Sequence, residues 1–188
     1  MFGMLNRVEP QVEWKVMHAG VALPLLAANG KDSGLRCEAH YLSGRYPKYV
    51  KTGAARLAAD EATAALFFET QSESVSSSRK RVAYVPAVGG LSDALLQKID
   101  GADLLLFDGT FWSDDEMQRV QGSGETAHQM GHIPVKESLQ LLRDINVGRK
   151  MFIHLNNTNP VLDEASAEHR TVRAAGWEVA EDNWQLEL

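Results

Sequence analysis

Two short apolar runs in the middle of the chain each stop at a side chain that can bind a metal ion. Leu104–Phe107 runs into Asp108, and Met151–Ile153 runs into His154. Both runs are too short and too uniformly apolar for surface helices, so they predict buried β-strands.

A helix predicted over 134–145 joins the two strands, with Val135, Leu139 and Leu142 among its buried residues. Two strands connected through a helix favour parallel neighbours with a right-handed crossover. The carboxyl ends of parallel strands meet at one edge of the sheet, where open α/β folds bind their ligands. We therefore expect Asp108 and His154 to lie together at that edge.

The composition limits the class of protein. A chain of 188 residues is long enough for a hydrophobic core, and we expect one domain over residues 1–188. The net charge of −6 argues against a nucleic-acid partner, which would require a basic surface. The single cysteine, Cys37, excludes an internal disulfide. Since the sequence contains neither an apolar run of about 18 residues nor a signal-peptide pattern, we expect a cytoplasmic protein without a membrane partner.

The flanking segments predict antiparallel β-structure in the first half and alternating strands and helices in the second. A turn is predicted at Asn29-Gly30, and Gly176 should end the last helix. The expected strands are 11–19, 35–42, 65–70 and 81–85, the expected helices are 92–98 and 163–175, and 177–180 with 184–188 should form a closing strand or hairpin.

Polar side chains follow both central strands. Asp108 precedes Gly109, which permits a sharp turn, so its carboxylate can bind a ligand at the sheet edge or simply form the turn. Four amide or hydroxyl side chains follow His154. They could orient its imidazole, bind polar groups of a substrate, or cap the last helix. These four residues are Asn156, Asn157, Thr158 and Asn159.

His132 lies just before Pro134, the predicted first residue of the helix. The positive end of the helix dipole disfavours a protonated imidazole, which suits a base, a ligand or a hydrogen-bond donor; a simple capping role is the alternative. Ser113 and Glu116 have the spacing of a capping box, so the acidic segment around them predicts a helix start. We expect His128 to lie on the surface.

The chain resembles the family of coenzyme pyrroloquinoline quinone (PQQ) biosynthesis protein B, in particular its carboxy-terminal half. The similarity is dense from residue 79 to residue 188 and looser before that. The strings that carry it are Phe107-Asp-Gly-Thr-Phe-Trp-Ser-Asp-Asp-Glu-Met117, Met130-Gly-His-Ile-Pro134, Ile153-His-Leu-Asn-Asn-Thr-Asn-Pro160 and Ala174-Ala-Gly-Trp-Glu-Val179.

This resemblance implies an α/β protein with the metallo-β-lactamase-like αββα sandwich. Asp108 matches the aspartate that can bridge metals, His154 matches the last metal-binding histidine, and His132 resembles the histidine that related nucleases place near the scissile phosphate. The first metal motif of the superfamily, His-x-His-x-Asp-His, is absent from the chain. The chain is therefore expected to be a distal part of the family's domain, with a sandwich that is incomplete at its N-terminus.

The implied activity is metal-dependent hydroxylation of the tyrosine in a peptide-derived Glu-Tyr precursor of PQQ. Iron is the expected metal, with zinc as the alternative. Asp108 and His154 would bind the metal, His132 would be catalytic, and residues 156–159 would bind the substrate. The alternatives are a non-catalytic remnant or carrier of PQQ or its precursor, and a metal-dependent phosphodiester hydrolase.

An incomplete sandwich also predicts self-association. The strands that contain Tyr84, Leu105 and Phe152 would lack a partner layer for their apolar faces. Exposed apolar area of this kind promotes dimers or aggregates.

Overall fold

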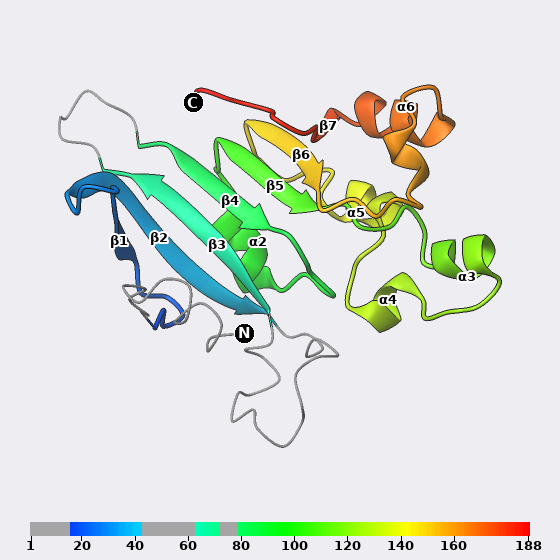
Figure 1. The fold of residues 1–188 in the computed structure, drawn as a ribbon, viewed down its shortest axis with the longest axis horizontal. Helices are drawn as coiled ribbons and strands as arrows, with labels where there is room; N and C mark the ends of the chain where they lie inside the picture. Colours follow the sequence, from blue (N-terminus) through cyan, green and yellow to red (C-terminus); the bar gives the residue numbers. More distant parts are fainter. Residues whose placement is uncertain (1–15, 43–62, 72–78) are drawn as a thin grey trace, which may run out of the picture.

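The computed structural model describes residues 16–42, 63–71 and 79–188, which form one seven-stranded sheet with helices packed on it (Figure 1). The strands lie in the order of the sequence. They are β1 (Leu23–Leu26), β2 (Asp32–Leu42), β3 (Thr63–Thr70), β4 (Arg81–Val85), β5 (Leu104–Asp108), β6 (Arg149–Ile153) and β7 (Trp177–Val179). The helices are α2 (Asp93–Ile99), α3 (Glu116–Gln121), α4 (Ala127–Met130), α5 (Val135–Leu141) and α6 (Ala167–Ala174), with a 3₁₀ turn, η2 (Pro160–Leu162).

The direction of the strands changes at β4. Strands β1 to β4 are antiparallel to their neighbours, whereas β4 to β7 run parallel. Strands β5 and β6 are adjacent, and Asp108 is paired in register with Ile153, the residue before His154. The predicted parallel arrangement of these two strands is therefore confirmed, and both strands end at the same edge.

One face of the sheet packs on the helices and contains the core. Figure 1 shows α2 behind the strands, and its buried Leu95 and Ile99 belong to the same hydrophobic cluster as the sheet. Phe152 and Trp177 stack with their ring centroids 4.2 Å apart. The side chains of the sheet that are fully buried in this cluster are Ala65, Ala83, Val85, Leu105, Phe107, Phe152 and Trp177.

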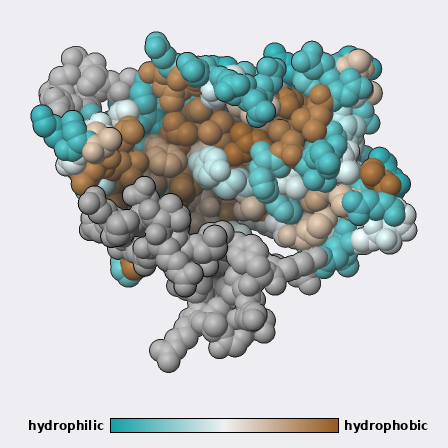
Figure 2. All heavy atoms as spheres, in the orientation of Figure 1, coloured by the Kyte–Doolittle hydropathy of each residue, from teal (hydrophilic) through white to brown (hydrophobic). Residues whose placement is uncertain are grey.

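The opposite face of the sheet is apolar and partly exposed. Val82, Tyr84 and Leu106 alternate with the core residues and are only partly buried. Figure 2 shows a hydrophobic area across the middle of the strands. Leu105 and Phe152 themselves belong to the core cluster that includes the helices, so of these three strand residues Tyr84 lies on the partly exposed face. Self-association through that face stays a prediction.

Two predicted helices are shorter in the structure. Helix α5 begins at Val135, with Pro134 in the cap position, and ends at Leu141. Helix α6 begins only after Ser166, whose hydroxyl accepts a hydrogen bond from the backbone N–H of His169. Each helix thus begins directly after its cap residue, later than the apolar pattern predicts.

Two predicted strands also differ. The described part of the first, 16–19, forms no strand, because the chain turns at Gly20 with φ 75° and the N–H of Val21 bonds to the carbonyl of His18; residues 11–15 lie outside the described residues. Strand β7 confirms the closing strand, while 184–188 form none. Within the described ranges, no helix has the length and apolar character needed to cross a membrane.

Candidate metal centre

The site lies where β5 and β6 end. The N–H of Gly109 donates to the carbonyl of Ile153 at 2.8 Å, which holds the ends of the two strands together. A Cβ atom at position 109 would lie 2.8 Å from Cβ of Phe152 and 3.0 Å from the Ile153 carbonyl oxygen. Only glycine allows this close approach, and it places Asp108 and His154 side by side.

Asp108 is the buried centre of the site, with no exposed surface. Its Oδ1 accepts hydrogen bonds from the N–H of Thr110 (3.1 Å) and the hydroxyl of Thr110 (2.6 Å). Its Oδ2 accepts from the N–H of Val88 (3.0 Å) and from Nδ1 of His132 (2.7 Å). Burial raises the pKa of Asp108, but the hydrogen bonds from His132 and Thr110, together with the nearby His154, outweigh it, so the pKa lies below its ordinary value. The carboxylate is therefore ionised at neutral pH.

His154 has an unusual backbone and an accessible side chain. Its φ of 57° lies in the left-handed region, which few residues other than glycine adopt. Its side chain is 55% exposed, and Nδ1 lies 3.0 Å from the hydroxyl oxygen of Thr110. The Thr110 hydroxyl donates its only proton to Asp108, so it accepts from a protonated Nδ1 of His154. The Nε2 atom is then free to bind a ligand.

Asp108 also acts on His154 through its charge. At 4.0 Å from Nδ1, its Oδ1 lies beyond hydrogen-bonding distance. The Asp108 carboxylate raises the pKa of His154, partial burial lowers it, and the carbonyl of Pro86 raises it further; the net pKa lies above its ordinary value.

His132 reaches the site through a tight turn. Gly131 adopts φ 87°, and the N–H of Ile133 bonds to the carbonyl of Val88, which brings the imidazole beside Asp108. An ionised carboxylate only accepts hydrogen bonds, so Nδ1 of His132 is the donor and Nε2 is free. The ring packs edge-on against Phe111. Both histidines thus have Nδ1 fixed by Asp108, one directly and one through Thr110.

The three side chains form a group that fits a metal ion. Among the described residues, one ligand atom from each of Asp108, His132 and His154 lies within 4.8 Å of the others. Two imidazoles and one carboxylate are the donor set of many zinc sites and of non-haem Fe(II) sites. Hydrogen-bonded histidines of this kind are also typical around metals. The structure adds His132 to the two ligands predicted from the sequence.

The predicted helix start in the acidic segment is confirmed, but the predicted capping box at Ser113 is wrong. Helix α3 begins at Glu116, and Asp115, not Ser113, occupies the cap position. The Glu116 side chain turns inward and is 1% exposed. Its carboxylate accepts hydrogen bonds from the N–H of Trp112 and the hydroxyl of Thr158, both at 2.6 Å.

The four polar residues after His154 differ in their surroundings. Asn159 is 2% exposed; its amide donates to the carbonyl of Gly109 at 2.8 Å and accepts from the N–H of Val161. The amide of Asn156 donates to the hydroxyl of Thr158 at 2.6 Å. Asn157 is the exposed member. Three of the four therefore bond within the chain, and their proposed contact with a substrate stays a prediction.

His128 lies on the surface, as predicted, and its Nε2 is 3.0 Å from the carboxylate of Glu137. It does not join the metal-binding group.

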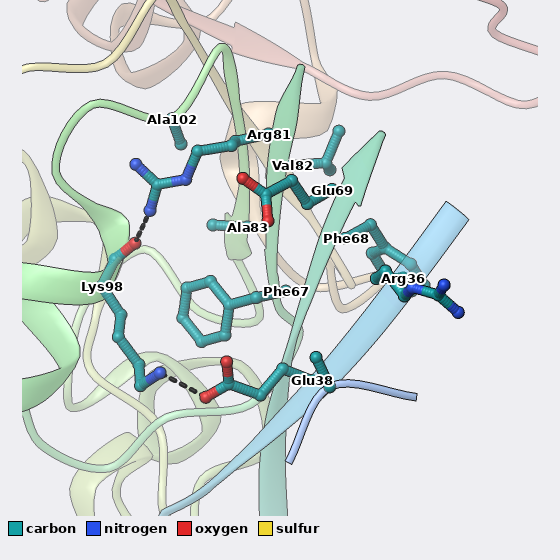
Figure 3. Close-up of a pocket in the computed structure, with 11 residues that line it drawn as sticks. Arg36, Glu38, Phe67, Phe68, Glu69, Arg81, Val82, Ala83, Lys98 and Ala102 are labelled. Atoms are coloured by element: carbon teal, nitrogen blue, oxygen red, sulfur yellow. Dashed lines mark hydrogen bonds and ion pairs between the residues drawn. The ribbon is translucent and has the colours of Figure 1, made fainter. Parts of the chain in front are cut away.

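A cavity of about 140 Å³ lies near the start of β4, at the opposite end of the sheet from Asp108 (Figure 3). The guanidinium of Arg81 donates to the carbonyls of Lys98 (2.8 Å) and Asp100 (3.1 Å) at the end of α2. The ammonium of Lys98 in turn pairs with Glu38 beside the ring of Phe67. These partners lie within the chain, so the side chains around the cavity anchor α2 to the sheet.

Residues 3–155 match the family described as the beta-lactamase superfamily domain, and the chain belongs to that superfamily. The sheet and the metal-binding group at its edge are those of a metallo-β-lactamase-like protein. More specifically, the chain is similar to coenzyme PQQ synthesis protein B. It is 43% identical to that protein from Xanthomonas oryzae pv. oryzae over 123 residues, covering 64% of this chain and 41% of the relative. It is 37% identical to that from Methylorubrum extorquens over 158 residues, covering 82% and 51%.

Solved structures agree with this placement. The crystal structure of zinc-bound PqqB from Methylobacterium extorquens superposes with a TM-score of 0.79 and 31% identity, covering 99% of this chain and 62% of that one. A diphosphatase of the PhnP family, at 16% identity and a TM-score of 0.58 over 98% of this chain and 54% of that one, shares the fold. The chain spans about half the length of the curated relatives it matches. The predicted family resemblance and fold are confirmed.

Proposed function

We propose that this chain takes part in PQQ biosynthesis as a metal-dependent hydroxylase in the cytoplasm. The observation that carries the proposal is the group of one buried carboxylate and two imidazoles at the carboxyl edge of the sheet. The similarity to PQQ synthesis protein B supports the assignment to PQQ biosynthesis. The relative of known structure is bound to zinc, and zinc is the alternative metal for this chain.

Iron is the proposed metal because two histidines and one carboxylate with open positions are the ligands of Fe(II) oxygenases. Asp108, His132 and His154 would hold it, and when bound it would supply the activation of O₂. The residues of the chain fix the geometry. Asp108 and Thr110 hold both imidazoles beside the carboxylate, and the burial of Asp108 excludes water from one side.

The proposed substrate is the tyrosine ring of a small peptide-derived Glu-Tyr precursor. A ring C–H bond is replaced by C–O–H with one atom of O₂, and the other atom leaves as water after a reductant such as ascorbate supplies two electrons. Asn157 is exposed three residues after His154 and can contact polar groups of the precursor. In the catalytic role predicted from the sequence, His132 would instead hold or move a proton; its side chain is 15% exposed and donates to Asp108.

The test is turnover of a Glu-Tyr peptide by the purified chain reconstituted with Fe(II) in the presence of O₂ and ascorbate. Mass spectrometry should detect one added oxygen atom, and label from ¹⁸O₂ should appear in the product. Asp108→Ala and His154→Ala should abolish turnover, and the surface variant His128→Ala should not. Zinc should bind but give no product, because it has no redox chemistry.

The proposal fails if the chain binds stoichiometric Fe(II) and incorporates no labelled oxygen. Metal-dependent cleavage of a phosphodiester that is lost in His132→Ala would support the hydrolase alternative instead. A chain that binds PQQ or its precursor but no metal would support the carrier alternative.

A further inference from the structure

Glu116 is a buried carboxylate outside the metal-binding group. Its carboxylate receives two short hydrogen bonds, from the N–H of Trp112 and from the hydroxyl of Thr158. Burying an ionisable group costs free energy unless its partners compensate. Glu116 lies at the start of α3, where the helix dipole stabilises a negative charge. An outward-facing, solvated carboxylate at the same position would have the same interaction. The inward orientation therefore needs a further reason.

The two partners of Glu116 lie on different loops of the site. Trp112 belongs to the loop that follows β5, directly after Asp108 and Thr110. Thr158 belongs to the loop that follows β6 and begins with His154. Glu116 is thus a side-chain link between the segment that carries the carboxylate and the segment that carries the exposed imidazole.

A continuous chain of donors and acceptors completes this link. The amide of Asn156 donates to the oxygen of Thr158 at 2.6 Å, and the Thr158 hydroxyl donates to Glu116 at 2.6 Å. The backbone N–H of Asn156 donates to the carbonyl of Thr110 at 3.0 Å, the residue that contacts His154. A shift of the second loop would therefore move His154 relative to Thr110.

We propose that Glu116 and Thr158 are positioning residues that hold the loop of His154 against the loop of Asp108. They set the contact between Thr110 and Nδ1 of His154, and through it the direction of the free Nε2 atom. A carboxylate accepts from both donors, whereas a glutamine offers one accepting oxygen and a donating amide, so one of the two donors loses its acceptor. The inference rests on the proposed metal centre, and its test separates the two.

The test compares Co²⁺ binding by the full chain and by Glu116→Gln, Thr158→Val and Thr158→Ser, with visible absorption as the readout of metal geometry. Removing a hydrogen-bonding partner around metal ligands costs about 10- to 100-fold in metal affinity, so Glu116→Gln and Thr158→Val should show that loss and a changed spectrum. Thr158→Ser retains the hydroxyl and should restore both. The matched control is Glu137→Gln, an exposed glutamate on α5, which should leave both unchanged.

A second readout needs no metal. Long-range ¹H–¹⁵N spectra of the metal-free chain report which nitrogen of His154 carries the proton. The wild type should show the Nδ1–H form, and Glu116→Gln and Thr158→Val should show a mixture of the two forms. Because the pair acts as one unit, the double variant should be no worse than the more severe single variant.

The proposal is overturned if Glu116→Gln and Thr158→Val fold, bind Co²⁺ with the affinity and spectrum of the wild type, and keep His154 in the Nδ1–H form. Thr158→Val preserves side-chain shape, so it decides the matter if Glu116→Gln does not fold. A wild type that binds no Co²⁺ would defeat the proposed metal centre. The proton distribution on His154 would then still support or refute the positioning role.

Discussion

Replacing Thr110 with valine removes the one hydroxyl that connects Asp108 to His154. Thr110 is 7% exposed, and its hydroxyl donates to Oδ1 of Asp108 at 2.6 Å and accepts from Nδ1 of His154 at 3.0 Å. Valine has the same shape, so the substitution creates no cavity. Its effects should therefore come from the lost hydrogen bonds alone.

The expected loss of stability follows from these contacts. A hydrogen bond to a charged group contributes about 1.5–3 kcal/mol. Asp108 keeps three other donors, the N–H groups of Thr110 and Val88 and the imidazole of His132, so its charge is not left unpaired. We expect the free energy of unfolding to fall by about 2 kcal/mol, near the lower end of that range. Zinc affinity should fall by about 10- to 100-fold, because His154 loses the partner that fixes its Nδ1 proton.

Urea unfolding of the metal-free chain measures the first quantity, and a competition titration with a zinc chelator measures the second. Thr171→Val is the matched control, since the Thr171 hydroxyl is exposed and donates only to the carbonyl of Ala167 within α6. The control should change the free energy of unfolding by less than about 0.5 kcal/mol. If Thr110→Val behaves like Thr171→Val in both assays, Thr110 is not the connection between the two side chains.

Three further outcomes are expected. Phe152→Ala should lower the free energy of unfolding by about 3–5 kcal/mol in urea, because the ring is fully buried and stacked, whereas the exposed Leu141→Ala should cost far less. Gly109→Ala should destabilise by about 1–3 kcal/mol and weaken zinc binding in the same titration, since its Cβ would force β5 and β6 apart. The lowered pKa of Asp108 contributes stability that is present above its unfolded pKa, about 3.9, and is lost as the pH falls through the folded value. Acid unfolding should show this loss, and Asp108→Asn should show a flatter dependence on pH.

The parallel pair at the centre of the sheet was predictable because its information is local. Two apolar runs, a connecting helix and a general rule of chain connection place Asp108 and His154 at one edge, and the structure confirms the pairing. Neither the pairing of the strands nor the position of the two side chains depends on the path of a long loop. Each polar side chain is fixed at the edge because it directly follows its strand.

The position of His132 was not predictable in the same way. It lies 24 residues from Asp108 along the chain, and its place depends on how the intervening segment turns. A capping box between Thr126 and Gln129 starts α4, and the left-handed Gly131 ends it. Each of these features can be found in the sequence, but the path of the segment that contains them depends on packing against the rest of the sheet. The contact between Asp108 and His132 is therefore determined by tertiary packing.

The polar residues after His154 show a related limit. Their composition suits either a substrate or the protein's own backbone, and the sequence alone leaves both open. In the structure, nearby groups of the protein determine their partners: Asn159 lies beside the carbonyl of Gly109, and Thr158 lies beside Glu116. Buried polar groups must find partners, so three of the four bond inward. Glu116 itself was misplaced as a capping residue because it is the first residue of α3 rather than the third.

The backbone of His154 supplies an independent reason to assign it a function. A left-handed conformation costs about 1–2 kcal/mol for a residue with a Cβ atom, whereas glycine adopts it freely and asparagine more easily than most. The side chain of His154 is 55% exposed, so burial in the core does not repay this cost. The Nδ1 contact with Thr110 offsets part of this cost and fixes the proton on Nδ1. A strained, exposed imidazole that belongs to a group of possible metal ligands is best explained by a role in binding.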